Sequence, residues 1–195
     1  MTPNENLEID SLLFGRFNPL QPQNISGYFS DILFAKPVEI DASIELVWSV
    51  ITDFSAYPLW NPLNRSFQLD TVAKPGEKVT FGVSWGPYTK DNHVVPVSDL
   101  KTSLKQHEML TVWQPNQCLA YADDLGTWHR AERVQYISQL PNNRTRYQTY
   151  ERWAGLITPI IRLFYSKKTQ MGFKANSQAL KTRAETLAKD SSKSV

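Results

Sequence analysis

The chain has 195 residues, a length typical of one domain of about 150 residues with short extensions. Its 21 basic and 19 acidic residues leave a net charge of +2, which argues against nucleic acid as a partner, because nucleic-acid-binding domains carry a strongly basic face. The single cysteine, Cys118, excludes a disulfide framework, and no apolar stretch approaches the roughly 20 residues that a membrane span needs.

Residues 1–30 predict an N-terminal arm or lid rather than a domain. They are rich in Asn, Pro, Gln and Ser, and contain one apolar island around Phe14 and Phe17. Such an arm is either disordered or packs locally as a cover. The first ten residues lack a basic start followed by an apolar run, so no secretory signal is indicated and a cytoplasmic location is expected.

The next segment predicts one strand and two short helices. Residues 32–40 are apolar and β-branched, and predict a strand that ends at Asp41. Asp41 or Ser43 is a suitable N-cap for a helix whose apolar residues follow at helical spacing to Ile51. Residues 54–62 predict a second short helix or turn between two prolines.

From residue 64 onward, the apolar period changes to two and predicts an antiparallel meander. The expected strands are 65–73, 77–85, 103–113, 117–123, 127–139 and 143–153, with a turn at Pro141-Asn142-Asn143. In the last strand, Thr145, Tyr147, Thr149, Glu151 and Trp153 are expected to face the interior. The alternate residues Arg144, Arg146, Gln148, Tyr150 and Arg152 are expected to face solvent. Residues 86–101 predict a long loop, of the kind that is usually functional or mobile.

Residues 158–189 predict one long helix, with Thr158 as its cap and Pro159 at its first position. The polar tail 190–195 is expected to fray. Basic residues gather here: Lys167, Lys168, Lys174, Lys181, Arg183 and Lys189. At helical spacing such a set is more typical of a solvated face than of a contact with an anionic surface.

The element order predicts an α+β helix-grip fold: a curved antiparallel sheet of about seven strands wrapped around a long C-terminal helix, with two short helices after the first strand. The long helix must bury an apolar stripe against the sheet. A curved sheet that grips one helix leaves a space between them, which is the candidate site. One domain is expected over residues 31–189.

Three segments resemble the SRPBCC superfamily, which includes the START and plant pollen-allergen-like proteins, and within it the polyketide cyclase/dehydrase-like branch. The sequence from Ile40 through Trp48 to Asp53-Phe54-Ser55-Ala56-Tyr57-Pro58-Leu59-Trp60-Asn61-Pro62 is similar to the opening of these domains. Thr145 to Gly155 resembles their final strand, and Gly172 to Glu185 resembles the end of their long helix. The resemblance spans 32–187 and implies a helix-grip fold with a hydrophobic pocket. Members include aromatic cyclases, lipid and quinone carriers and hormone receptors, so the fold alone does not decide the function.

Glu151 is the first candidate for chemistry, because a carboxylate that faces the interior can have a raised pKa and act as a general acid or base. On the neighbouring strand, Arg130 and Glu132 share a face with Trp128, Val134 and Tyr136. If that face is internal, Arg130 can polarise a carbonyl and the carboxylates can move a proton. The alternative for all three catalytic candidates is a structural ion pair.

Aromatic residues make up 12% of the chain and suit the walls of a ligand cavity, although the same residues also favour ordinary sheet packing. The residues expected to bind a ligand are Tyr57, Trp60, Phe81, Trp85, Tyr88, Trp113, Tyr121, Trp128, Tyr147, Trp153 and Phe164. No metal and no cofactor are expected, since His93, His107 and His129 lie far apart and no phosphate-binding or nucleophile motif is present. Cys118 is expected to be a small buried hydrophobe.

Two functions remain open. The first is a cofactor-free cyclase, dehydratase or isomerase of secondary metabolism acting on a polyketide-like or terpenoid substrate. The alternative is a non-catalytic carrier or sensor for a lipid, quinone or other apolar ligand. A cavity smaller than about 150 Å³ would rule out both, because ligand sites usually measure ~300–1,000 Å³. A homodimer is possible, and an interaction module has no positive support.

Overall fold

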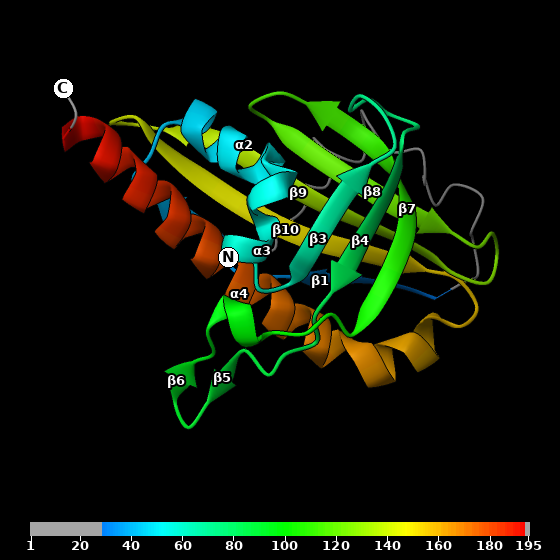
Figure 1. Ribbon diagram of the computed structural model, residues 1–195. Helices are drawn as coiled ribbons and strands as arrows, with labels where there is room; N and C mark the ends of the chain where they lie inside the picture. The colour runs from blue at the N-terminus through cyan, green and yellow to red at the C-terminus, as the bar shows by residue number, and fades with distance from the viewer. Residues whose placement is uncertain (1–28, 194–195) are drawn as a thin grey trace.

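The computed structural model describes residues 29–193 (Figure 1). The predicted arm at 1–30 therefore lies almost wholly outside the described residues. Within residues 29–193, no helix is both long enough and apolar enough to cross a bilayer.

The predicted strand at 32–40 is two strands, β1 (Ser30–Phe34) and β2 (Val38–Ile40). Both pair antiparallel with β10 (Arg144–Ala154), at different ends of that strand. The break falls at Pro37, which has no N–H to donate to a ladder. The sheet consequently has eight strands, one more than the number expected from the sequence.

The helix after β2 is α2 (Ile44–Thr52), and Ser43 rather than Asp41 is its N-cap. Ser43 Oγ accepts a hydrogen bond from the backbone N–H of Leu46 at 3.3 Å. The following turn, η2 (Phe54–Ala56), leads into the short helix α3 (Tyr57–Trp60). The two helices are tied together by Tyr57, whose hydroxyl donates to the backbone oxygen of Ile51 at 2.6 Å.

The main sheet is antiparallel, with the strand order β1-β10-β9-β8-β7-β4-β3 and with β2 also beside β10. Its remaining strands are β3 (Asn64–Leu69), β4 (Lys78–Val83), β7 (Leu104–Gln114), β8 (Cys118–Asp124) and β9 (Arg130–Leu140). The predicted long loop between β4 and β7 contains a small hairpin, β5 (Thr89–Lys90) and β6 (His93–Val94), and the turn η3 (Val97–Asp99). In Figure 1 this hairpin projects from the body of the molecule.

The long helix α4 (Thr158–Lys193) crosses one face of the sheet, and α2 lies beside its C-terminal half (Figure 1). It buries Phe173, Leu180 and Ala184 in the core. The helix continues through Lys193, four residues beyond the predicted end at 189. The helix-grip architecture predicted from the sequence is confirmed.

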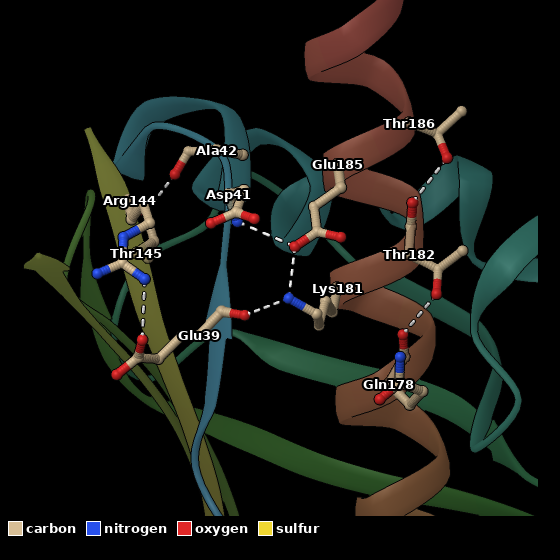
Figure 2. A network of polar contacts seen from close by, with 10 residues as sticks. All are labelled: Glu39, Asp41, Ala42, Arg144, Thr145, Gln178, Lys181, Thr182, Glu185 and Thr186. Atoms are coloured by element: carbon tan, nitrogen blue, oxygen red, sulfur yellow. Dashed lines mark hydrogen bonds and ion pairs between the residues drawn. The ribbon is translucent and has the colours of Figure 1, made fainter. Parts of the chain in front are cut away.

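The C-terminal half of α4 is held to β2 and the β2–α2 turn by a polar cluster (Figure 2). Lys181 Nζ donates to the backbone oxygen of Glu39 and to Glu185 Oε1, both at 2.5 Å. Glu185 Oε1 also accepts the backbone N–H of Asp41 at 3.0 Å. These contacts fix one end of α4, and no comparable cluster of polar contacts is seen for residues 158–172 in the described chain.

The face of the sheet away from α4 carries a second buried cluster, formed by Val112, Cys118, Ala120, Val134 and Tyr150. Gln148 and Tyr150 are only 5% and 3% exposed, so the expectation that the whole alternate set of β10 faces solvent is wrong. The period of two does separate the two faces of β10, but both of its faces bury residues.

Candidate functional site

The β9–β10 hairpin decides which residues of β9 face α4. Its turn has three residues, 141–143, so Leu140 pairs with Arg144, and counting along both strands places Arg133 opposite Glu151. Paired residues in an antiparallel sheet point to the same face. Because Glu151 faces the interior, the internal set of β9 is Ala131, Arg133, Gln135 and Ile137.

The expectation that Arg130 and Glu132 face the cavity beside Glu151 is therefore wrong. Arg130 Nε forms an ion pair with Asp124 Oδ1 at 2.8 Å near the end of β8. Glu132 is buried on the far face, where Thr111 Oγ1 donates to its Oε1 at 2.6 Å. Burial raises the pKa of Glu132, and the Thr111 hydrogen bond and the charge of Arg152 partly offset that shift. Arg130 is thus in a structural ion pair, but with Asp124 and not with Glu132, so the alternative of an Arg130–Glu132 pair is not what the structure has.

Arg133 is the residue that the sequence analysis missed. Its side chain is buried between the sheet and α4, and its guanidinium carbon lies 4.8 Å from the centre of the Phe173 ring. Nη1 donates to Asn64 Oδ1 at 3.1 Å and to Tyr121 Oη at 3.0 Å. Nη2 is buried and has no hydrogen-bond partner among the described residues. A buried N–H donor without an acceptor is rare, and it marks the position where an oxygen of a ligand is best accommodated.

Arg133 remains a cation in this environment. Burial alone lowers the pKa of its guanidinium, but Tyr121, Tyr147 and Glu151 raise the pKa further than burial lowers it. Guanidinium is also the cation that proteins bury most readily, because it stacks on aromatic rings and is weakly hydrated. The site therefore presents a fixed positive charge inside the protein.

Two carboxyl groups share the cavity with this cation. Burial raises the pKa of Glu151, while the hydrogen bond from Trp153 Nε1 at 2.8 Å and the charge of Arg133 oppose the shift. Burial raises the pKa of Glu108 well above its ordinary value, and the nearby charges of Glu151 and Asp123 raise it further. Glu108 comes from β7, and nothing in its local sequence marked it as a site residue.

The cavity lies between the sheet and the middle of α4. Its lining combines apolar and polar residues: Leu63, Asn64, Phe81, Val83, Trp85, Gln106, Glu108, Tyr121, Arg133, Glu151, Thr169 and Phe173. It measures about 50 Å³, room for a few water molecules and well below the ~300–1,000 Å³ of organic ligand sites. This volume is also below the limit of about 150 Å³ set above for both the enzyme and the carrier, so the cavity as it stands in this conformation contradicts both functions. In this conformation the protein therefore has the wall of a ligand site but not the volume of one.

A larger surface depression of about 520 Å³ lies between the start of α2 and the β9–β10 turn. Asp41, Ser43, Asn142 and Arg144 are among its lining residues, and it shares none with the internal cavity. The internal cavity contains the buried cation and both carboxyls, and it is therefore the candidate site.

The expected aromatic residues divide into three groups. Phe81, Trp85 and Tyr121 line the cavity. Tyr57, Trp60, Trp113, Tyr147, Trp153 and Tyr88 pack around it in the core, and Trp153 also donates to Glu151. Trp128 and Phe164 are 60% and 63% exposed and face away from it, so the expectation that these two bind an internal ligand is wrong.

The histidines and the cysteine offer no further site. The residues from 29 to 193 contain no group of three or more His, Cys, Asp or Glu that could hold a metal ion. His107 Nδ1 lies 3.0 Å from Thr80 Oγ1, and burial lowers the pKa of His129. Burial raises the pKa of the Cys118 thiol to about 12, so this thiol stays protonated at neutral pH.

Comparison with solved structures places this fold among proteins of several roles. A START superfamily protein from Mycobacterium smegmatis aligns with a TM-score of 0.55 and 20% identity over 83% of this chain and 99% of its own. The ZhuI aromatase/cyclase from Streptomyces sp. R1128 aligns with a TM-score of 0.59 and 13% identity over 80% and 94%. Norcoclaurine synthase from Thalictrum flavum, in complex with dopamine and hydroxybenzaldehyde, aligns with a TM-score of 0.55 and 9% identity over 82% and 88%.

These identities are too low to transfer a function, and they support the fold alone. A search of curated proteins finds no match to the sequence. A family model described as polyketide cyclase / dehydrase and lipid transport matches residues 32–185, which is most of the chain and all of the sheet except the first residues of β1. The chain therefore belongs to this polyketide cyclase/dehydrase and lipid transport family, within the SRPBCC superfamily.

Proposed function

We propose that the protein is a cofactor-free enzyme that binds a hydrophobic carbonyl compound between the sheet and α4 and catalyses its cyclisation, dehydration or isomerisation. Membership in the family and the START-like neighbours support a hydrophobic ligand. The observation that carries the proposal is the unpartnered Nη2 of Arg133, a buried cationic donor in a cavity that also contains two carboxyls with raised pKa.

Arg133 would hold the oxygen of a substrate carbonyl and stabilise the negative charge that develops on it as a neighbouring carbon loses its proton. Fixed donors aimed at a developing oxyanion are among the largest contributions to enzymatic rate enhancement. The guanidinium is already held by Asn64, Tyr121 and Phe173, so little reorganisation is needed when the charge forms.

The two carboxyls would divide the proton transfers between them. Burial raises the pKa of Glu151, but the Trp153 hydrogen bond and Arg133 oppose that shift, so Glu151 gives up its proton more readily than Glu108 and would be the base that takes a proton from carbon. Asp123 and Glu151 favour the neutral form of Glu108, which makes it the acid that returns a proton. In a dehydration, that proton joins the leaving hydroxyl and departs as water, so atoms and charge balance. Pairs of carboxyls with separated pKa values are typical of acid–base active sites.

The small volume of the cavity requires that ligand entry enlarge it. The first half of α4 is the element best suited to move, because the polar cluster of Lys181 and Glu185 holds the second half, whereas the first half has only the partly exposed ion pair of Arg162 with Asp31 on β1 at 3.1 Å. Thr169 and Phe173 form the α4 side of the cavity, so a shift of this half-helix widens it directly. A carrier of an apolar ligand would need the same movement.

The carrier remains the second candidate because five of the twelve lining residues are apolar: Leu63, Phe81, Val83, Trp85 and Phe173. Native mass spectrometry of gently purified protein separates the two. A stoichiometric hydrophobic adduct favours the carrier and gives the class of ligand. Protein without an adduct favours an enzyme that holds its substrate weakly.

The chain provides matched controls for an activity test on the identified substrate. Arg133→Gln and Glu151→Gln are compared with Arg130→Gln and Glu132→Gln, which change the same residue types on the other face of the sheet. We expect turnover to fall by about 100-fold or more in the first pair, the usual effect of removing an oxyanion donor or a general base. Turnover in the second pair stays near that of the wild type. Equal turnover in Arg133→Gln and Arg130→Gln disproves the proposed mechanism.

A further inference from the structure

The first half of α4 exposes a row of large apolar side chains to solvent. Its outward stripe is apolar: Ile160, Leu163, Phe164 and Met171 recur at spacings of three, four and seven residues and are 61%, 78%, 63% and 45% exposed. The opposite side, toward the sheet, buries the polar Thr169 together with the apolar Phe173, and Ile161 packs against the core, so this half of the helix is apolar on both sides. A surface helix of a soluble protein normally has its apolar face toward the core only.

The exposed apolar surface of α4 continues beyond the helix onto the turn between β8 and β9. The backbone N–H groups of Leu156 and Ile157 donate to the oxygens of Thr127 and Trp128, both at 3.1 Å. This contact brings Trp128, 60% exposed, and Leu156, 42% exposed, next to the start of α4. We name the surface of Trp128, Leu156, Ile160, Leu163, Phe164 and Met171 the apolar stripe. Contiguous exposed apolar residues of this kind mark an interaction site.

The chain segment that carries most of the apolar stripe has only positive charges. From residue 152 to residue 184 the sequence contains no acidic residue, and its basic residues are Arg152, Arg162, Lys167, Lys168, Lys174, Lys181 and Arg183. Two acidic side chains of neighbouring elements form ion pairs: Asp31 with Arg162 at 3.1 Å and Asp124 with Arg130 at 2.8 Å. Lys167 and Lys168 are exposed beside the stripe.

We propose that the apolar stripe is a docking surface for an anionic lipid bilayer. Apolar and aromatic side chains that enter the acyl boundary, with lysines that reach phosphate headgroups, are the combination that holds a helix in the plane of a membrane. Sequence periodicity favoured a solvated face for these lysines, but a solvated helix would not place Leu163 and Phe164 beside them.

A second copy of the chain fits the same surface less well than an anionic bilayer does. In a two-fold interface the same patch meets itself, so Lys167 and Lys168 of one copy would approach those of the other. Such repulsion has no acidic residue in the 152–184 segment to relieve it. A bilayer containing acidic lipids supplies the missing negative charge.

Docking here would bring the cavity close to the membrane. Thr169 and Phe173 line the cavity from the inner side of the half-helix whose outer side carries Phe164 and Met171. Tyr165 lies between the two sides, with its ring 5.9 Å from that of Trp85 and 5.6 Å from Lys168 Nζ. A bilayer bound to the apolar stripe could deliver or receive an apolar ligand without exposing it to water. The docking itself does not depend on the proposed catalytic function.

The test is co-sedimentation of the full chain with vesicles of phosphatidylcholine, with and without phosphatidylglycerol. The docking variants are Leu163→Ser with Phe164→Ser, and Lys167→Glu with Lys168→Glu. Their controls are Leu59→Ser, which changes another exposed leucine on α3, and Lys74→Glu with Lys90→Glu, exposed lysines outside α4. The five side chains changed in the docking variants and in the leucine control are all exposed, and circular dichroism checks that every variant folds.

We expect binding only to vesicles that contain phosphatidylglycerol, with a loss of more than tenfold in both docking variants. Each lysine near an anionic surface contributes roughly fivefold in affinity, so two charge reversals exceed that threshold. The controls and Arg133→Gln bind as the wild type does. The proposal is overturned if no vesicle binds the protein, or if the docking variants bind as well as the controls. It is equally overturned if the wild type forms a dimer in solution that Leu163→Ser with Phe164→Ser abolishes.

Discussion

Arg133 and Glu151 are register partners on adjacent strands, yet their charged groups turn to different neighbours. The guanidinium bonds to Asn64 and Tyr121, and the carboxylate accepts from Trp153. No direct ion pair between them is present among the described residues. The two groups do not neutralise each other, so each can still interact with a bound molecule. In a structural salt bridge, the two charges would be occupied by one another.

Replacing Arg133 with Met is expected to preserve or increase stability. A buried charge held only by neutral partners carries a large desolvation penalty, and apolar replacements of buried charges are often neutral or stabilising by 1–4 kcal/mol. Met has a similar length and retains a favourable contact with the Phe173 ring. Urea denaturation of Arg133→Met against the wild type measures the change.

A structural role for Arg133 predicts the opposite sign. If the guanidinium mainly holds Asn64 and Tyr121 in place, Arg133→Met lowers the free energy of unfolding by more than about 2 kcal/mol. Arg130→Met is the matched control, since its exposed ion pair with Asp124 is worth about 1 kcal/mol or less.

Stability should fall as the pH rises through the raised pKa values of Glu108 and Glu151. Burial raises both above the ordinary value of 4.5, so the folded protein holds these protons more tightly than the unfolded chain. The free energy of unfolding is then largest below about that pH and decreases as the pH rises through the folded pKa values. Thermal unfolding of the wild type across this range gives the slope.

The double variant Glu108→Gln with Glu151→Gln should flatten this slope, because amides do not titrate. Its gain in Tm over the wild type is expected to be larger at pH 8 than at pH 4. The exposed Glu45→Gln on α2 should leave the slope unchanged. A slope in the double variant equal to that of the wild type contradicts the buried-carboxyl interpretation.

Gly155→Ala should severely destabilise the start of α4. Gly155 has a φ of +127°, and an added Cβ would lie 2.5 Å from the backbone oxygen of Trp128. The strained backbone and the clash together should cost more than about 2 kcal/mol. Gly126→Ala is the control: its φ is +66° but no atom lies within 4 Å of the added Cβ, so about 1 kcal/mol is expected. Similar losses in the two variants would show that the close approach to Trp128 does not matter.

The cluster that holds the second half of α4 is expected to give the opposite pH dependence. The Asp41 N–H and Lys181 outweigh burial and lower the pKa of Glu185. A lowered carboxyl pKa stabilises the fold above the unfolded value of about 4.5 and is lost as the pH falls through the folded pKa. Glu185→Gln should therefore lose stability mainly at neutral pH, by about 1 kcal/mol for a weakened hydrogen bond. A Tm difference from the wild type that is equal at pH 3 and pH 7 would disprove the linkage.

Much of the fold followed from local patterns in the sequence. Ser43 was one of two candidate caps for α2, the alternation on β10 correctly placed Glu151 and Trp153 inward, and Pro159 marked the start of α4. The three-residue turn Pro141-Asn142-Asn143 also sets the register that pairs Arg133 with Glu151. Arg133 could therefore have been found in the sequence by counting back along both strands from the turn.

Other parts of the site depend on contacts that no single strand encodes. Glu108 reaches the cavity only because β7 pairs with β8 across a bulge between Leu110 and Val112, and β8 pairs with β9. A shift of one residue at any of these pairings would turn the carboxyl to the other face. The bulge has no signature in the local sequence, so Glu108 could not be placed from it.

The sequence by itself determined the class of fold, the order of its elements and the inward phase of β10, because these follow from periodicity, caps and turns within short segments. The tertiary structure decided which residues meet in the cavity and that the cavity is small, because both depend on strand register and on how α4 lies on the sheet. It also decided that Leu163 and Phe164 face outward. In the sequence, an apolar stripe on a helix indicates burial, and only the packing of α4 shows that this stripe is left exposed.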